Sequence, residues 1–313
     1  MSGDVAVQAG DLTKYYGTRR GIDGLDLTVR VGEVMGFLGP NGAGKTTTIR
    51  LMLDFLRPTR GRVEVLGLDP CRDKAALHRQ VGYLPGELIL PGRERADQLL
   101  RFFAEARGGV PSAEITALAG RLDLDLSQPV RTMSKGNKQK VGLVQAFMHR
   151  PALLILDEPT SGLDPLMQQE FLGMVREARD GGQTVFMSSH VLAEVQQVAD
   201  RVAIIRDARL VAVEKVESLG HRAVRTVEIH FGAPVEAAEF AGLPGVSDVA
   251  VSGPSLRCTV DGSLDPLVKA AARYEVVDLL SAEPDLEETF LSYYYHLEGD
   301  GDAAGTGAQD VAR

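Results

Sequence analysis

One stretch decides the fold of this 313-residue chain: Val34-Met35-Gly36-Phe37-Leu38-Gly39-Pro40-Asn41-Gly42-Ala43-Gly44-Lys45-Thr46-Thr47. Its first five residues form a short apolar run, which predicts a buried strand. Residues 39–46 match the pattern G-x-x-x-x-G-K-[ST] in full, and apolar residues at helical spacing continue to Leu56. A strand, a glycine-rich loop and a helix in this order predict a phosphate-binding loop, because backbone N–H groups and the helix N-terminus then converge on phosphate oxygens.

The predicted nucleotide contacts are the residues of this loop and of the helical turn that follows. The Lys45 ammonium reaches the β- and γ-phosphates, and the Thr46 hydroxyl is a magnesium ligand. We therefore expect ATP and Mg²⁺ as cofactors. The predicted set is Gly39, Pro40, Asn41, Gly42, Ala43, Gly44, Lys45, Thr46 and Thr47.

A second buried strand ends in two carboxylates, in the stretch Leu153-Leu154-Ile155-Leu156-Asp157-Glu158-Pro159. An acidic residue at a strand end beside the phosphate loop can hold Mg²⁺ through water, and we assign Asp157 to that position. Glu158 is one residue further and points elsewhere, so it is the predicted base for an attacking water. A less specific interpretation is that both are solvated carboxylates at a strand end, and the phosphate loop argues against it.

Composition limits the class of protein. The longest nearly unbroken apolar run, Ala152 to Leu156, is far shorter than the roughly 20 residues of a membrane-spanning helix. Met1 to Gln8 is polar and mixed, so we expect no signal peptide and a soluble cytoplasmic chain. The two cysteines, Cys71 and Cys258, are far apart, which disfavours a disulfide framework or a cysteine metal site. A net charge of −9 disfavours nucleic acid as a partner.

The order of elements predicts two domains. Strands alternate with helices up to about residue 220, which predicts a mostly parallel, covered sheet. Composition shifts near His221, and residues 221–297 then predict a small α+β domain, with a ferredoxin-like arrangement as one option. Its expected helices include Val235 to Ala241 and Leu286 to Tyr295. The tail from Glu298 to Arg313 is rich in Gly, Ala and Asp, and we expect it to be disordered.

From about Val5 to Glu217 the chain resembles the nucleotide-binding subunit of an ATP-binding cassette (ABC) transporter. The resemblance implies a phosphate-loop NTPase fold, with a RecA-like mixed sheet core and a helical subdomain at about 93–148. It rests on an ordered set of motifs. Besides the loop and the carboxylates, these are a signature turn with Ser134, Lys135, Gly136 and Asn137, a D-loop with Ser161, Gly162, Leu163 and Asp164, a switch histidine, His190, and an aromatic residue, Tyr16, that stacks on adenine.

Single members of this set have simpler interpretations. We expect Ser134 to Lys140 to form a turn, but Ser134 is also a suitable helix N-cap. Asp164 before Pro165 is a suitable N-cap as well. Tyr15 competes with Tyr16 for the aromatic position.

The family mechanism that the resemblance implies uses two cassettes, so a second copy of the chain is an expected partner in an ATP-dependent homodimer. They face each other head to tail, and each ATP lies between the phosphate loop of one and the Ser134–Gly136 turn of the other. Glu158 orients or deprotonates water, and His190 contacts the γ-phosphate. Hydrolysis removes the link and the pair reopens.

Two departures from the family pattern are visible. A glutamine that contacts Mg²⁺ and water usually follows the strand that ends Tyr-Leu-Pro, whereas Gly86 and Glu87 stand here. Glycine offers no side chain for this contact, and Glu87 is the candidate substitute ligand. In the signature, Lys135 replaces a glycine and Asn137 replaces the glutamine.

The resemblance extends to the branch of two-gene, ABC-2 type exporters of drugs, antibiotics or polysaccharides. It implies a separate membrane permease that docks near Tyr83 to Phe103 and holds this subunit at the cytoplasmic face of the membrane. Four alternatives stay open: an exporter of polysaccharide or lipid, a soluble ABC ATPase without a transport role, another phosphate-loop enzyme, and a catalytically idle nucleotide-binding module.

Overall fold

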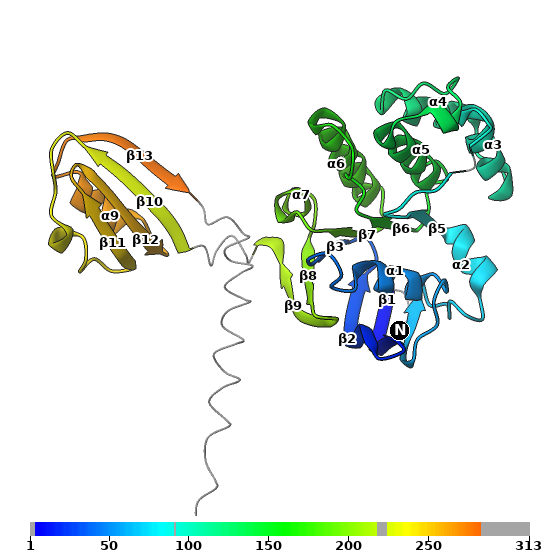
Figure 1. Cartoon of the computed structure of the whole chain (residues 1–313), viewed down its shortest axis with the longest axis horizontal. Coiled ribbons are helices and arrows are strands. Elements are labelled where there is room, and N and C mark those ends of the chain that lie inside the picture. Colours follow the sequence, from blue (N-terminus) through cyan, green and yellow to red (C-terminus); the bar gives the residue numbers. More distant parts are fainter. Residues whose placement is uncertain (1–3, 91, 218–223, 283–313) are drawn as a thin grey trace, which may run out of the picture. The chain divides into compact units, whose positions relative to one another are not determined.

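The structure, a computed structural model, describes residues 4–90, 92–217 and 224–282 (Figure 1). The chain divides into two compact units, Met1–Val216 and Glu217–Arg313, so the division falls slightly before the expected boundary at residue 220. None of the helices in the described ranges has the length and apolar content that crossing a bilayer requires.

A six-stranded sheet forms the centre of the first unit. In spatial order its strands are β5 (Val81–Leu84), β6 (Leu153–Asp157), β7 (Thr184–Ser189), β3 (Val34–Leu38), β8 (Arg201–Arg206) and β9 (Arg209–Lys215). Neighbours are parallel from β5 to β8, and β9 is antiparallel to β8. Every residue of β3, β6 and β7 is buried, as expected for strands covered on both faces. The carboxyl ends of these strands therefore meet at one edge, where ligands of such sheets bind.

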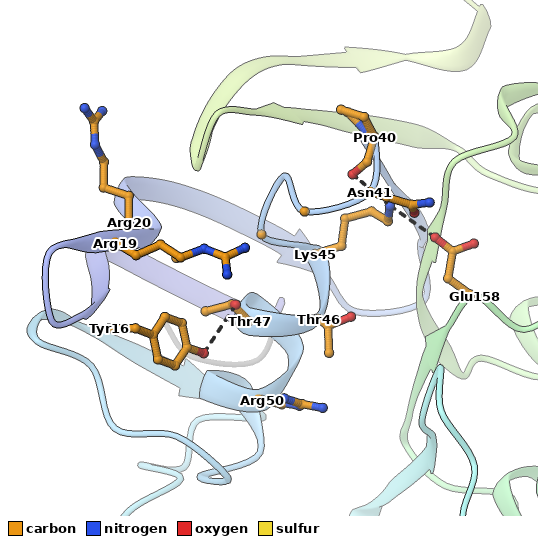
Figure 2. Close-up of a pocket in the computed structure, with 13 residues that line it drawn as sticks. Tyr16, Arg19, Arg20, Pro40, Asn41, Lys45, Thr46, Thr47, Arg50 and Glu158 are labelled. Carbon is orange, nitrogen blue, oxygen red and sulfur yellow. Dashed lines mark hydrogen bonds and ion pairs between the residues drawn. The ribbon is translucent and has the colours of Figure 1, made fainter.

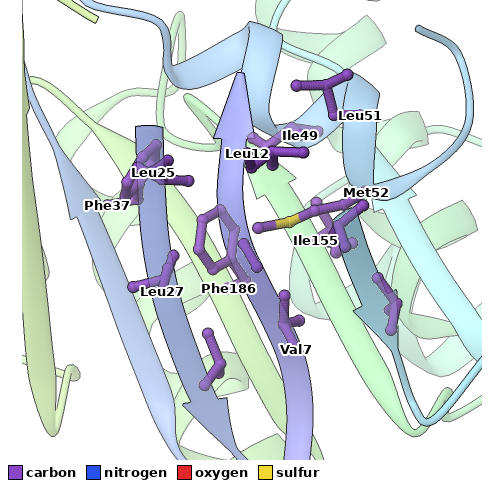
Figure 3. Packing of buried hydrophobic residues seen from close by; sticks show 14 of the residues in the cluster. Val7, Leu12, Leu25, Leu27, Phe37, Ile49, Leu51, Met52, Ile155 and Phe186 are labelled. Atoms are coloured by element: carbon purple, nitrogen blue, oxygen red, sulfur yellow. The ribbon is translucent and has the colours of Figure 1, made fainter. Parts of the chain in front are cut away.

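A three-stranded antiparallel sheet packs on this core. Its strands are β2 (Arg19–Arg30), β1 (Val5–Tyr16) and β4 (Arg60–Val65), in that order. Leu12 and Leu25 from it pack in one apolar cluster with Phe37 and Phe186 of the central sheet (Figure 3). The Phe37 and Phe186 ring centroids are 5.2 Å apart. Each such side chain contributes about 1.5–3 kcal/mol on burial, so the phosphate loop after β3 has a rigid base.

Helix α1 (Lys45–Met52) follows the phosphate loop and is shorter than the sequence predicted. The helical spacing continues to Leu56, but Asp54 adopts a left-handed conformation with φ 53°. The Leu56 N–H then bonds to the Arg50 carbonyl, which closes the helix before Pro58 is reached.

The helical subdomain contains α3 (Ala96–Ala106), α4 (Ser112–Arg121) and α5 (Lys135–Phe147). The prediction of a turn from Ser134 to Lys140 is wrong, because these residues form the beginning of α5. Ser134 is the N-cap, and its Oγ accepts a hydrogen bond from the Asn137 N–H at 3.2 Å. This cap outweighs the low helix propensity of Gly136. The two remaining helices of this unit that bear on the site are α6 (Pro165–Asp180) and α7 (Leu192–Gln196), and α2 (Lys74–Gln80) precedes β5.

The second unit is a four-stranded antiparallel sheet with its own core. The strand order is β11 (Val246–Ser252), β12 (Ser255–Asp261), β10 (Val224–Phe231) and β13 (Val276–Ala282), the order of a split βαβ fold, with α9 (Asp265–Ala271) as its helix. The helix predicted from Val235 to Ala241 is only a 3₁₀ turn, Ala237–Glu239. Pro234 and Gly242 leave little room there for a longer helix. The predicted helix from Leu286 to Tyr295 and the tail from Glu298 lie outside the described residues.

Candidate nucleotide-binding site

A cavity of about 510 Å³ opens beside the phosphate loop, between the start of α1 and the β1–β2 hairpin (Figure 2). Among the described residues that line it, Arg19, Arg20, Lys45 and Arg50 are basic, and Glu158 is acidic. This is a positively charged pocket in a chain of net charge −9, as a polyphosphate ligand requires. The lining residues are Tyr16, Arg19, Arg20, Gly21, Pro40, Asn41, Gly42, Gly44, Lys45, Thr46, Thr47, Arg50 and Glu158.

Backbone geometry explains the glycines of the loop. Gly42 and Gly44 have φ of 83° and 117°, in the region that favours glycine. A Cβ on Gly44 would also lie 2.6 Å from the Gly21 carbonyl oxygen. The loop can therefore turn tightly against the β1–β2 hairpin and lead directly into α1, whose N-terminus faces the cavity.

The Lys45 side chain is folded along the loop. It is 6% exposed, and its Nζ donates to the Gly39 carbonyl oxygen at 2.6 Å. The same Nζ forms an ion pair with Glu158 Oε1 at 3.1 Å. The ammonium is thus held at the mouth of the loop, beside the predicted base.

Asp157 ends β6 and is completely buried, so both of its oxygens need partners. Thr46 Oγ1 donates to Oδ2 at 2.8 Å, and Ser188 Oγ donates to Oδ1 at 2.5 Å. The negative charge is also felt by Tyr83, whose pKa is raised to about 12 by burial and, secondly, by Asp157.

Thr46 and Asp157 fit a magnesium site. They offer a hydroxyl and a carboxylate oxygen side by side, which are the hard ligands that Mg²⁺ prefers. In the described ranges no group of three or more Asp, Glu, His or Cys side chains is gathered to hold a metal. Phosphate oxygens and water would therefore supply the other ligands, as is common for Mg²⁺ at nucleotide sites.

Glu158 turns away from Asp157 because its backbone is left-handed, with φ 49°. The Glu158 N–H bonds to both the carbonyl oxygen and Oγ of Ser188, which holds this conformation. One carboxylate oxygen of Glu158 pairs with Lys45, and the other lies 2.7 Å from His190 Nδ1. The predicted base and the predicted switch histidine are therefore in direct contact.

The structure distinguishes the two competing tyrosines. Tyr16 lines the cavity, and its hydroxyl lies 3.5 Å from Thr47 Oγ1. Tyr15 instead donates to Asp23 at 3.3 Å and does not line the cavity. A Cβ on Gly21 would lie 2.7 Å from the Tyr16 ring, so glycine at this position lets the ring lie against Thr47.

The signature residues lie elsewhere. Ser134 to Asn137 do not line the cavity of their own chain, and two of them, Lys135 and Gly136, contact the D-loop. Lys135 Nζ donates to Ser161 Oγ at 3.0 Å, and a Cβ on Gly136 would lie 2.6 Å from the Gly162 carbonyl oxygen. Asp164 caps α6 through the Met167 N–H, at 3.0 Å, with Leu163 buried before it. Ser134 and Asp164 are therefore helix caps, whatever further role they have.

Comparison with known proteins agrees with this geometry. The sequence pattern described as "ABC transporter" matches residues 22–161. The daunorubicin resistance ATP-binding protein DrrA3 of Streptomyces coeruleorubidus is 34% identical over 311 residues, covering 95% of this chain and 97% of that protein. This chain belongs to the ABC transporter ATP-binding family.

Two further similarities support the family. The bacitracin transport ATP-binding protein BcrA of Bacillus licheniformis is 37% identical over 209 residues, covering 65% of this chain and 68% of that protein. A solved ATP-binding subunit of an ABC transporter aligns with a TM-score of 0.64 and 30% identity, over 68% of this chain and 91% of that chain. The chain is thus an ATP-binding ATPase subunit of a transporter. The family, cassette fold and ATPase activity predicted from sequence are confirmed.

The two residues at the altered glutamine position differ in their surroundings. A Cβ on Gly86 would lie 3.2 Å from the Asp157 carboxylate, so the position itself faces the proposed metal site. Glu87 is exposed, and in the described part of the cassette its side chain makes no hydrogen bond or ion pair. The structure therefore brings Gly86, but not Glu87, to Asp157.

Sequence reasoning missed several residues of the site. Ser188 holds both Asp157 and the Glu158 backbone. Gln139, 3% exposed, donates to the Pro159 carbonyl oxygen at 3.0 Å and so ties α5 to the loop after β6. Their only sequence signals were a serine at the end of a buried strand and a glutamine inside the signature helix.

Proposed function

We propose that this cassette powers the export of a small drug-like or antibiotic-like molecule through a separate ABC-2 type permease, at the cytoplasmic face of the membrane. The support is the whole-length similarity to a protein named for daunorubicin resistance, because that similarity includes the second unit as well as the cassette. The relative named for bacitracin transport points to the same class of cargo.

The proposed hydrolysis follows from the contacts of Lys45 and Glu158. A γ-phosphate at the loop competes for the Lys45 ammonium, which releases Glu158 from its 3.1 Å ion pair. Glu158 then accepts a proton from the attacking water, and His190, 2.7 Å away, keeps the carboxylate oriented. Mg²⁺ held by Thr46 and Asp157 would neutralise charge on the phosphates.

We propose a head-to-tail pair of cassettes because the signature residues do not reach the cavity of their own chain. The N-terminus of α5, a helix of 13 residues capped by Ser134, is positively polarised and suited to an anion. The γ-phosphate held by the loop of a second copy is an anion of the required kind. The Lys135–Ser161 contact would place the D-loop in the same interface.

An apolar groove supports a contact with the permease. It has a volume of about 310 Å³ and lies between α2, β5 and the helical subdomain. Phe55 and Ile89 line it and are 48% and 83% exposed, more than is usual for such large apolar side chains. A short cytoplasmic helix of a membrane protein is suited to such a groove. Tyr83 lines the groove, and its pKa is raised in part by the Asp157 charge. Docking in the groove would therefore change the electrostatic surroundings of the proposed metal site.

The test measures both ATP hydrolysis and co-purification with a permease. The wild-type chain should hydrolyse ATP, and Glu158→Gln should reduce the rate by about 100-fold or more. When the chain is co-expressed with candidate permeases, a six-span ABC-2 type partner should co-purify, and Ile89→Glu should abolish co-purification without loss of ATPase activity. A chain that hydrolyses ATP but captures no permease would support a soluble ABC ATPase and contradict the proposal.

A further inference from the structure

We propose that Arg19 is a nucleotide-contact residue, and that its guanidinium binds the phosphate chain of ATP at the α-phosphate end. The proposal rests on the placement of the base against Tyr16, which is itself proposed. It does not depend on the permease or on the cargo.

The register of the β1–β2 hairpin places Arg19 directly opposite Tyr16. Gly17 and Thr18 form a two-residue turn, and Tyr16 and Arg19 pair directly across it. Directly paired residues point to the same face of a sheet, and their side chains lie within reach of each other. Both line the cavity beside the phosphate loop. A base that stacks on Tyr16 therefore brings its ribose and first phosphate close to Arg19.

The next pair of the hairpin has the opposite orientation. Arg20 pairs with Tyr15, and both side chains interact with Asp23: Tyr15 through a 3.3 Å hydrogen bond, Arg20 through a 3.7 Å ion contact. Arg20 also lines the cavity. In Figure 2 its guanidinium points away from the phosphate loop, whereas the Arg19 side chain extends toward it.

Arg19 also differs from Lys45 and Arg20 in making no ion pair among the described residues. Lys45 forms an ion pair with Glu158 at 3.1 Å, and Arg20 makes a longer ion contact with Asp23 at 3.7 Å. Arg50 lies on α1 and points away from Tyr16 in Figure 2. Within residues 4–90, 92–217 and 224–282, the Arg19 guanidinium makes no hydrogen bond or ion pair. A free planar guanidinium at a phosphate pocket is suited to a bidentate contact with phosphate oxygens.

The order of base, ribose and phosphates along ATP determines which phosphate Arg19 contacts. The base end is at Tyr16 and the outer phosphates are at Lys45. Thr47 lies between these two ends, with its hydroxyl 3.5 Å from the Tyr16 hydroxyl. Because the α-phosphate joins the ribose to the outer phosphates, it must pass Thr47 and so comes within reach of Arg19.

The test is equilibrium binding of ADP and GDP to the full chain, with Arg72→Gln as the matched control for Arg19→Gln. Arg72 is an exposed arginine that does not line the cavity, and its guanidinium lies 3.6 Å from Asp69. Removing an exposed charge pair costs on the order of a fivefold loss of affinity. We expect Arg19→Gln to weaken both nucleotides by about this factor, less so at high salt, and Arg19→Lys to recover part of the loss. Arg72→Gln should change affinity by less than about twofold.

Two results would overturn the proposal. One is an equal effect of Arg19→Gln and Arg72→Gln. The other is a loss confined to ADP, because a phosphate contact does not distinguish bases. Tyr16→Ala tests separately whether the base stacks on Tyr16. An unchanged ADP affinity in this variant would refute that placement and, with it, the assignment of Arg19 to the α-phosphate. Unchanged melting temperatures of all variants control for folding.

Discussion

Asp157 occupies a buried, crowded position, and this makes the neighbouring Gly86 sensitive to substitution. A methyl group on Gly86 would lie 3.2 Å from the Asp157 carboxylate, closer than such contacts normally are. We expect Gly86→Ala to displace that carboxylate, to lower the ATPase rate on the order of tenfold and to raise the Mg²⁺ concentration needed for half-maximal rate. Steady-state ATPase assays over a Mg²⁺ titration measure both effects.

Glu87→Ala is the matched control for that substitution. Its carboxylate is exposed and unpaired among the described residues, so we expect a rate and Mg²⁺ dependence within twofold of wild type. A changed Mg²⁺ dependence in Glu87→Ala, with none in Gly86→Ala, would instead make Glu87 the substitute ligand and contradict the placement described above.

His149 gives the cassette a pH dependence. Burial and, secondly, the nearby Arg107 charge lower the pKa of His149 to about 4. Because the unfolded chain has a histidine pKa near 6.5, it binds more protons than the folded chain between pH 6.5 and 4. Stability should therefore fall as pH falls through this window. In His149→Gln, whose amide oxygen can still accept from Arg107, the urea midpoint should fall less between pH 7 and 5 than in wild type.

The sequence predicted which residues are neighbours where those residues belong to the same short motif. Lys45 and Thr46 are consecutive, as are Asp157 and Glu158, and the strand ends bring the two pairs within 3.1 Å. Ser188 and Arg19 reach the same site from other strands, and no local pattern marks a serine or an arginine for that role. Their contribution depends on strand register, which the sequence does not specify by itself.

At the scale of elements, one arginine holds the helical subdomain to the core. Arg121 of α4 forms two hydrogen bonds to Glu177 of α6, at 2.6 and 2.8 Å, and a third to Glu170 at 2.6 Å. Hydrogen bonds from Arg121 lower the pKa of Glu177. We expect Arg121→Gln to lower the free energy of unfolding by about 1 kcal/mol, measured by urea denaturation.

Arg150→Gln is the control for that prediction. Among the described residues, the Arg150 side chain makes a single exposed ion pair, with Glu114 at 3.0 Å, so its loss should cost less than half as much. If both variants lose the same stability, the Arg121 contacts are ordinary surface ion pairs.

Element types were easier to predict than element ends. The buried strands β3, β6 and β7 were visible as apolar runs because both faces are covered. The start of α5 was not, because glycine and lysines at 135–138 have the composition of a turn and the deciding feature is the Ser134 cap. The end of α1 likewise depends on one left-handed residue, Asp54.

At the scale of the whole molecule, each unit has its own apolar core, and the ATP site belongs entirely to the first. Ser134 and the N-terminus of α5 do not line this cavity, which is the basis of the proposed head-to-tail pair. The sequence predicted a site shared by two copies only through its resemblance to a family. Composition and periodicity do not indicate which surface would meet a second copy. We therefore propose that two chains share each ATP.

The most direct test is sedimentation of Glu158→Gln with and without Mg²⁺-ATP, compared with the double variant Glu158→Gln/Ser134→Arg. We predict that the single variant is a monomer without ATP and a dimer with it. The double variant should bind ATP with unchanged affinity and remain a monomer, because the added side chain blocks the approach of α5 to the second nucleotide. A single variant that stays monomeric at saturating ATP, or a double variant that dimerises equally well, would contradict the account.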